Sequence, residues 1–197
     1  AYRGEGLSFK PYPCGRPLHA AIDAALAARA ALGIGRADDI AAATIVADAA
    51  GHRDQFQAGP IKRRPTQVVQ AQFAQPFLVS CALALGRVGI RDVDRHDDPA
   101  VLALADRIEG EALDGAPKGH VAIRLRHRDG RTVEVAAVDP TGSPSRPMPQ
   151  AQFEAKFRDN AANARVPIAG AAVDRLLAML RSLDELPDVR VLAEAVE

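Results

Sequence analysis

A β-hairpin around Asp129-Gly130 is the feature of this sequence that most constrains the fold. A two-residue turn would place Leu125 opposite Glu134, which mixes apolar and charged side chains on both faces of the ribbon. A three-residue loop over 128–130, with its glycine in the left-handed conformation, gives consistent faces instead. It pairs Leu125 with Val133, Ile123 with Val135, and Arg124 with Glu134. The pattern predicts an antiparallel sheet with one polar face and one face that needs covering helices.

The rest of the first 145 residues supplies those helices and further strands. Proline, glycine and apolar spacing predict helices after Pro17 as far as Gly33, over Thr66–Gly86 with a Thr66 cap and a kink at Pro76, and after Pro99. Strands are expected at Ile40–Ala47 and near Arg107–Leu113, the second joining the antiparallel sheet, with a loop over Gly51–Pro65. The expected fold class is therefore α+β, an antiparallel sheet with packed helices.

A proline-rich segment, Thr141–Pro149, marks a boundary. We expect an α+β domain over residues 1–145 and C-terminal helices over 146–197. One helix is expected at about Pro149–Ala162, and the next carries one apolar stripe. The stripe consists of Val173, Leu176, Leu177, Leu180 and Leu183. It is too apolar to face water, so we expect these helices to join an all-helical domain outside this chain.

Composition limits the possible functions. The chain has 25 Lys+Arg and 25 Asp+Glu in 197 residues, so it has no basic field for nucleic acid or anionic lipid. No stretch approaches the ~20 apolar residues of a spanning helix, and the first residues lack a secretory pattern. Two cysteines in a chain of this length suggest reduced thiols. We therefore expect a cytoplasmic protein that binds neither nucleic acid nor membrane.

Familiar catalytic motifs are missing from the sequence. The five histidines include no HExxH pattern, and His120 and His127 point to opposite faces of a strand. Gly33-Ile34-Gly35 follows a helix and lacks the third glycine of a dinucleotide fingerprint. No nucleophile-elbow pattern occurs. We expect no metal site and no cofactor.

The segment from Ser8 to His19 is the most informative for function. Pro11 and Pro13 stiffen it, so Lys10, Arg16 and His19 would be held near backbone N–H groups that favour anions. This arrangement suits a carboxylate. Lys10 offers a compact ammonium, Arg16 a guanidinium that can form two hydrogen bonds at once, and His19 a base that can act near neutral pH. Lysine is scarce in this chain, which otherwise uses arginine; the four lysines are Lys10, Lys62, Lys118 and Lys156. Asp23, four residues after His19 on the helix, is placed to orient its ring.

These residues resemble the MmgE/PrpD family, which includes 2-methylcitrate dehydratase, cis-aconitate decarboxylase and iminodisuccinate epimerase. The similar segments are Lys10-Pro11-Tyr12-Pro13-Cys14 with His19–Ala24, Pro65–Gly86, Asp129-Gly130-Arg131, and Gly142–Met148 with Lys156-Phe157. They occur in the family's order and cover nearly the whole chain.

The resemblance implies cofactor-free chemistry on small di- or tricarboxylates, as in propionate metabolism. A proton leaves from beside a carboxylate, and water or CO₂ is lost or the carbon is reprotonated. The chain corresponds to the lid and returning C-terminal helices of a homodimeric lyase, whose N-terminal helical half, outside this sequence, holds the main acid–base histidines. The implied site residues are Lys10 and His19 as catalytic groups, with Tyr12, Cys14, Gly15 and Arg16 binding the substrate.

One position departs from the family. Phe77 stands where the family helix commonly has a tyrosine, so a phenolic proton donor is excluded there. Three functions therefore stay open: a dehydratase or decarboxylase lid, an epimerase lid that needs no leaving-group acid, and a non-catalytic binding or assembly module that retains the fold.

Overall fold

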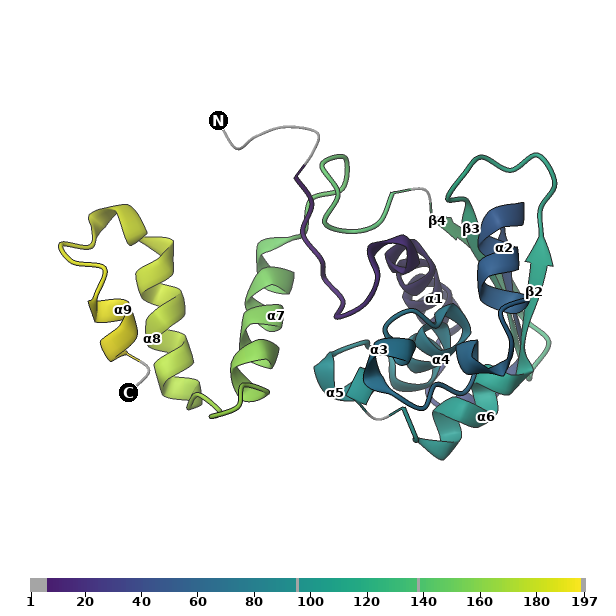
Figure 1. The fold of residues 1–197 in the computed structure, drawn as a ribbon, viewed down its shortest axis with the longest axis horizontal. Coiled ribbons are helices and arrows are strands. Elements are labelled where there is room, and N and C mark those ends of the chain that lie inside the picture. The colour runs from purple at the N-terminus through teal and green to yellow at the C-terminus, as the bar shows by residue number, and fades with distance from the viewer. Residues whose placement is uncertain (1–6, 95, 138, 196–197) are drawn as a thin grey trace. The chain divides into compact units, whose positions relative to one another are not determined.

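The computed structural model describes residues 7–94, 96–137 and 139–195. The chain divides into two compact units, Ala1–Pro147 and Met148–Glu197. Figure 1 shows a sheet packed with helices in the first unit and a set of helices in the second. Each unit is described by itself below.

The first unit is built around a sheet that contains four strands among the described residues, in the order β2-β1-β3-β4. The strands are β1 (Ile40–Ala47), β2 (Ile108–Ala112), β3 (Val121–His127) and β4 (Thr132–Ala137). The predicted α+β class is confirmed. β1–β3 and β3–β4 are antiparallel, but β2, which we expected to join as an antiparallel strand, runs parallel to β1. The connection from β1 to β2 contains several helices, and a long helical crossover permits a parallel neighbour.

The predicted hairpin register is confirmed. The cross-strand partners are Leu125↔Val133, Ile123↔Val135 and Arg124↔Glu134. Gly130 has φ +95°, the left-handed conformation that the three-residue loop requires. On the polar face, Arg124 of β3 forms ion pairs with Glu134 of the neighbouring β4 and, across β1, with Glu111 of β2.

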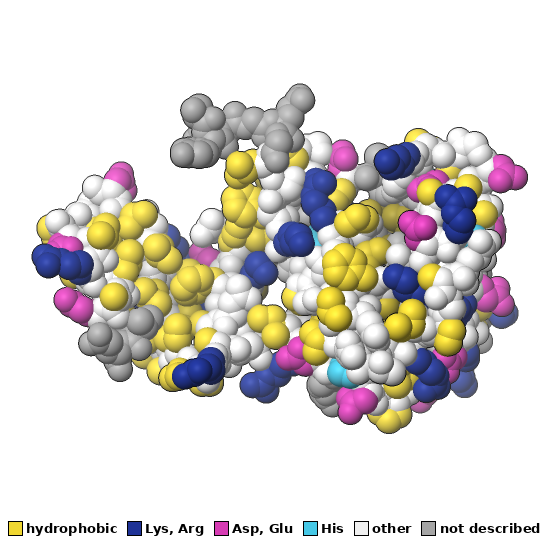
Figure 2. Space-filling view, viewed as in Figure 1, with side chains coloured by type: hydrophobic (Ala, Val, Ile, Leu, Met, Phe, Trp, Pro, Cys, Tyr) yellow, Lys and Arg dark blue, Asp and Glu magenta, His cyan; other side chains and the backbone are white. Residues whose placement is uncertain are grey.

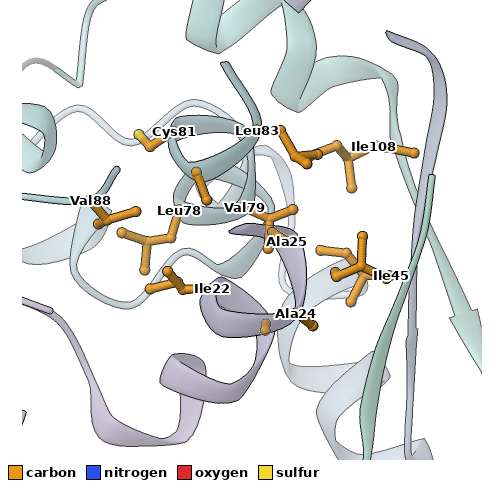
Figure 3. Packing of buried hydrophobic residues seen from close by; sticks show 14 of the residues in the cluster. Ile22, Ala24, Ala25, Ile45, Leu78, Val79, Cys81, Leu83, Val88 and Ile108 are labelled. Carbon is orange, nitrogen blue, oxygen red and sulfur yellow. The ribbon is translucent and has the colours of Figure 1, made fainter. Parts of the chain in front are cut away.

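Helix α1 (His19–Leu32) packs against β3, β4 and α4 (Gln75–Leu85). Pro17 lies in the short η1 turn (Arg16–Leu18) before it, and Gly33, at φ +65°, caps it, as predicted. Its buried face is mostly alanine, at positions 21, 24, 25 and 28, which lets the backbone approach its neighbours closely. Figure 3 shows Ile22 and Ala25 of α1 beside Leu78 and Val79 of α4, with Ile45 on the sheet side.

The loop predicted over Gly51–Pro65 is wrong. Its first part belongs to α2 (Ala49–Phe56), and η3 (Pro60–Lys62) follows. Asp48 starts α2, because its Oδ1 accepts the N–H groups of Ala50 and Gly51. The helix has no fully buried residue, so its sequence shows no apolar periodicity, and the cap was the signal that we missed.

The single helix predicted over Thr66–Gly86 is also wrong. The structure has two helices there, α3 (Val68–Ala71) and α4, with a break between them. Pro76 lies in the first turn of α4, where its missing N–H costs no hydrogen bond, so it starts a helix instead of kinking one. Thr66 does not cap α3; its N–H and hydroxyl donate to Gln70 Oε1. The predicted end at Gly86 is confirmed by φ +70°.

The remaining elements of the first unit are short helices and turns. The helix expected after Pro99 is α6 (Pro99–Arg107), capped by the Asp98 carboxylate. Neither α5 (Ile90–Asp94) nor the short η2 turn (Ala37–Asp39) was predicted from the sequence. The buried side chains of the sheet and helices form one apolar cluster that runs from the start of α1 to β4.

The second unit contains α7 (Gln150–Ala162), α8 (Gly170–Arg181), η4 (Leu183–Glu185) and α9 (Val191–Glu194). The expectation that the whole α8 stripe needs helices of another domain is wrong for Val173 and Leu177, which pack against Ala161 and Phe157 of α7. Leu180 and Leu183, at the end of the stripe, are 41% and 45% exposed. Figure 2 shows hydrophobic side chains gathered over this unit on the visible face. Across the described residues, every helix is too short or too polar to cross a membrane.

Candidate functional site

The loop from Lys10 to Arg16 is fixed to two other parts of the first unit. Before the loop, the Phe9 N–H donates to Gly142 O at 2.9 Å. After its two prolines, the Gly15 N–H donates to Gln72 O, also at 2.9 Å. A Cβ at Gly15 would lie 2.9 Å from the ring of Phe73, so a larger residue there would have to displace this exposed ring. The loop therefore has a defined path on the folded unit.

Asp23 is the polar centre beneath this loop. It is buried on α1, and its Oδ1 accepts the Tyr12 hydroxyl at 2.6 Å. Its Oδ2 accepts the Thr141 N–H at 2.6 Å and faces the Arg146 guanidinium at 3.4 Å. One carboxylate thus joins the loop, the first helix and the turn that follows the sheet.

The two predicted catalytic residues converge on one backbone oxygen. Lys10 Nζ donates to Cys14 O at 3.3 Å, and His19 Nε2 lies 3.4 Å from the same atom. A carbonyl oxygen only accepts, so this contact places the ring proton on Nε2 and leaves the lone pair of a neutral ring on Nδ1. Lys10 and His19 thus lie close together around a backbone carbonyl oxygen and not around the backbone N–H groups that the sequence suggested.

His19 is held as a neutral base. Its side chain is 1% exposed, and this burial lowers the pKa of the imidazole below its usual value. The nearby charges of Lys10 and Arg16 also lower that pKa, while the Cys14 carbonyl and Asp23 oppose the shift. The Tyr12 ring packs edge-on against the imidazole, with 5.4 Å between ring centres.

The predicted contact between His19 and Asp23 is not made. Tyr12, Thr141 and Arg146 occupy the Asp23 oxygens, and no hydrogen bond joins His19 to Asp23 within the described chain. The i,i+4 spacing is present, but the carboxylate orients the tyrosine and not the imidazole.

The predicted substrate-binding residues separate into buried and exposed groups. The Tyr12 hydroxyl is used by Asp23, and burial together with that hydrogen bond raises the pKa of the phenol. Burial raises the pKa of the Cys14 thiol to about 12, so it is a packed neutral thiol at neutral pH. The N–H of Gly15 is used by Gln72. Of this group, only Arg16 extends to the surface, where it donates to Ser8 Oγ at 2.9 Å.

Lys10 and Arg16 are therefore the exposed charges of the loop. Elsewhere, on the face in Figure 2, basic and acidic side chains are interspersed. The described chain contains no group of three or more His, Cys, Asp or Glu side chains that would hold a metal ion.

Two residues of this site were missed by the sequence analysis. Thr141 and Arg146 contact Asp23 across 118 and 123 residues of chain, a distance that no local pattern reveals. The one available signal was that Arg146 lies in the last of the segments that resemble the family. Phe77, the departure from the family pattern, is fully buried at the start of α4.

The fold and loop define an α+β domain that displays two cations beside a buried neutral imidazole. The sequence model of the MmgE/PrpD C-terminal domain matches residues 12–182, and this chain belongs to that family. The match confirms the resemblance found in the sequence and begins just after Lys10. No curated protein matches the chain.

Proposed function

We propose that this chain is the lid portion of a cofactor-free lyase, a dehydratase or decarboxylase, that acts on a small di- or tricarboxylate. The observation that carries the proposal is the convergence of Lys10 and a neutral His19 on Cys14 O, beside the exposed Arg16. Two cations neutralise substrate carboxylates, and a neutral imidazole accepts a proton.

Lys10 and Arg16 have hydrogen-bond donors left for a substrate, and His19 has a lone pair that can accept a proton. Lys10 uses one of its three N–H donors on Cys14 O, and Arg16 uses one nitrogen on Ser8. Their other donors suit carboxylate oxygens, with Arg16 able to bind two at once. The lone pair of His19 is on Nδ1, and since the ring is buried, proton transfer requires the loop to uncover that atom when substrate binds.

The principal acid–base groups would come from a helical half, which is either part of the same polypeptide or a separate subunit, and the assembled enzyme would be a homodimer. Phe77 favours an epimerase as the second candidate. An epimerase removes and returns a proton without an acid for a leaving group, and a buried phenylalanine supplies no such acid. A non-catalytic assembly module is the third reading.

Proton NMR in D₂O distinguishes these functions. An assembled enzyme that contains both halves is incubated with 2-methylcitrate, cis-aconitate or a chiral dicarboxylate. A lyase gives an alkene or a decarboxylated product, whereas an epimerase replaces an α-hydrogen by deuterium without net loss of water or CO₂. An assembled enzyme that leaves every carboxylate unchanged and unlabelled would support the binding module and contradict both catalytic proposals.

A further inference from the structure

A further exposed cation, Arg146, lies beside the loop of residues 10–16, which we call the cationic loop. The Arg146 side chain is 54% exposed and belongs to the turn that follows β4. Two backbone hydrogen bonds tie this turn to the start of the loop. The Gly142 N–H donates to Arg146 O at 2.8 Å, and Gly142 O accepts the Phe9 N–H at 2.9 Å. Lys10 is the next residue after Phe9, so Lys10 and Arg146 are held through one glycine.

Asp23 brings the Arg146 side chain toward the same site. One of its oxygens faces the Arg146 guanidinium at 3.4 Å, and the other accepts the Tyr12 hydroxyl at 2.6 Å. The Tyr12 ring in turn packs edge-on against His19. The charge of Arg146 also opposes the rise in the pKa of the Tyr12 phenol, as expected for close neighbours. Arg146 therefore lies on the side of the site where Tyr12 contacts His19.

Arg146 is held loosely and has donors left for a ligand. Both of its hydrogen bonds use Nη1, and both are long, 3.4 Å to Asp23 and 3.5 Å to Asp139 O. The short contacts of Asp23 are those to Tyr12 and Thr141, each at 2.6 Å, so the buried carboxylate does not depend on the guanidinium alone. Across the described residues, Nε and Nη2 of Arg146 have no hydrogen-bond partner. These two atoms form the edge of a guanidinium that can bind both oxygens of a carboxylate.

We propose that Arg146 binds a third carboxylate of the substrate, beside those bound by Lys10 and Arg16, and that the substrate is a tricarboxylate. This inference rests on the proposed function and narrows its di- or tricarboxylate substrate to one class. A dicarboxylate would leave the Nε–Nη2 edge of Arg146 in water, whereas a tricarboxylate uses all three cations. Arg146 determines specificity in this scheme and takes no part in proton transfer.

Two matched ligands isolate the third carboxylate. Tricarballylate and glutarate have the same chain with two terminal carboxylates, and tricarballylate has one more on its central carbon. Both are titrated calorimetrically into the 197-residue chain at about 0.15 M salt, which screens distant charges. The wild type should bind tricarballylate about tenfold more tightly than glutarate. Arg146→Met should weaken tricarballylate about tenfold and leave glutarate unchanged. A merely structural role of Arg146 would weaken both ligands, because both use the loop.

Arg131→Met is the matched control. Arg131 is 56% exposed and also pairs with an aspartate, Asp129, but it precedes β4, whereas Arg146 follows that strand. The control variant should bind both ligands as the wild type does.

Equal binding of the two ligands by the wild type would overturn the inference. So would an Arg146→Met variant that weakens both ligands alike or weakens neither. In each of these cases, glutarate binding that Lys10→Ala weakens would leave the proposed function standing. A wild type that binds neither ligand would contradict the carboxylate site itself, and this inference with it.

Discussion

At the residue scale, Asp23 determines how the cationic loop is held. Its carboxylate is buried and meets a hydroxyl from the loop, and a backbone N–H and a guanidinium from the turn that follows the sheet. A buried carboxylate needs such partners, because an unpaired charge in the interior is costly. The position of Lys10 and Arg16 therefore depends on a contact that neither residue makes.

Tyr12→Phe tests this dependence. The variant keeps the buried ring but removes the 2.6 Å hydrogen bond to Asp23, so we expect the free energy of unfolding to fall by about 1.5–3 kcal/mol. Arg146→Met removes a partner that is half exposed, and we expect a loss below about 1 kcal/mol. Urea denaturation followed by circular dichroism measures both. Equal losses in the two variants would show that burial of the Tyr12 contact is not what matters.

His19 predicts a pH dependence. Its pKa is lowered in the folded chain, so the unfolded chain takes up a proton first as the pH falls. The stabilisation by neutral His19 is complete above the unfolded pKa of about 6.5 and is lost as the pH falls from there toward the lower folded pKa. Unfolding free energies at pH 7.5, 6.5 and 5.5 should decline less steeply for His19→Gln than for the wild type. Parallel declines would contradict the assignment.

At the element scale, the turn after the sheet anchors the start of the loop. Gly142 has φ +88°, and a Cβ there would overlap the Phe9 carbonyl oxygen. Gly130, in the hairpin, has φ +95° but open space around the Cβ position. Both positions favour glycine because of their positive φ, but only Gly142 also lacks room for a Cβ atom.

We expect alanine substitutions at the two glycines to lower the free energy of unfolding by different amounts. Gly130→Ala should lower the free energy of unfolding by about 1–2 kcal/mol, from backbone strain alone. Gly142→Ala adds a steric overlap, so it should cost more and should shift the NMR signals of Phe9 and Lys10. Thermal unfolding and amide spectra of both variants check this. A smaller effect at Gly142 than at Gly130 would show that the turn does not hold the loop.

The helices and strands also show which parts of the fold the sequence predicts and which parts it does not. Period-two alternation and face parity predicted the β3–β4 register, because a slip of one residue would bury Glu134. The same reasoning gave the β2 segment but not its parallel direction, which depends on a crossover of many residues. Helix α2 was missed because it buries no residue completely and is started by the Asp48 cap. The Asp23 contacts, like the direction of β2, could not be predicted from local sequence patterns, because they join segments that are far apart in the chain.

At the scale of the whole molecule, the second unit carries exposed apolar surface. Phe153, Phe157, Leu177 and Leu180 line a shallow groove between α7 and α8 within this unit. Apolar surface of this kind stabilises a partner when it is covered, at roughly 25 cal/mol per Å². In the proposed assembled enzyme, that partner is the helical half.

The chain alone should therefore self-associate through this groove and the adjacent end of the stripe. We expect sedimentation equilibrium to show concentration-dependent dimers of the wild type, and monomers for the double variant Leu180→Glu/Leu183→Glu. Val189→Glu, at an exposed apolar residue outside the groove, is the control and should still dimerise. A wild type that stays monomeric at all concentrations would contradict this expectation.

The central claim is that the Lys10 loop forms a carboxylate site. Isothermal titration of citrate into the 197-residue chain at low salt tests it most directly, with Lys10→Ala compared to Lys156→Ala, a lysine of the second unit. The account predicts binding to the wild type, about tenfold weaker binding to Lys10→Ala, and unchanged binding to Lys156→Ala. Equal affinities for the two variants, or a wild type that does not bind citrate, would contradict it.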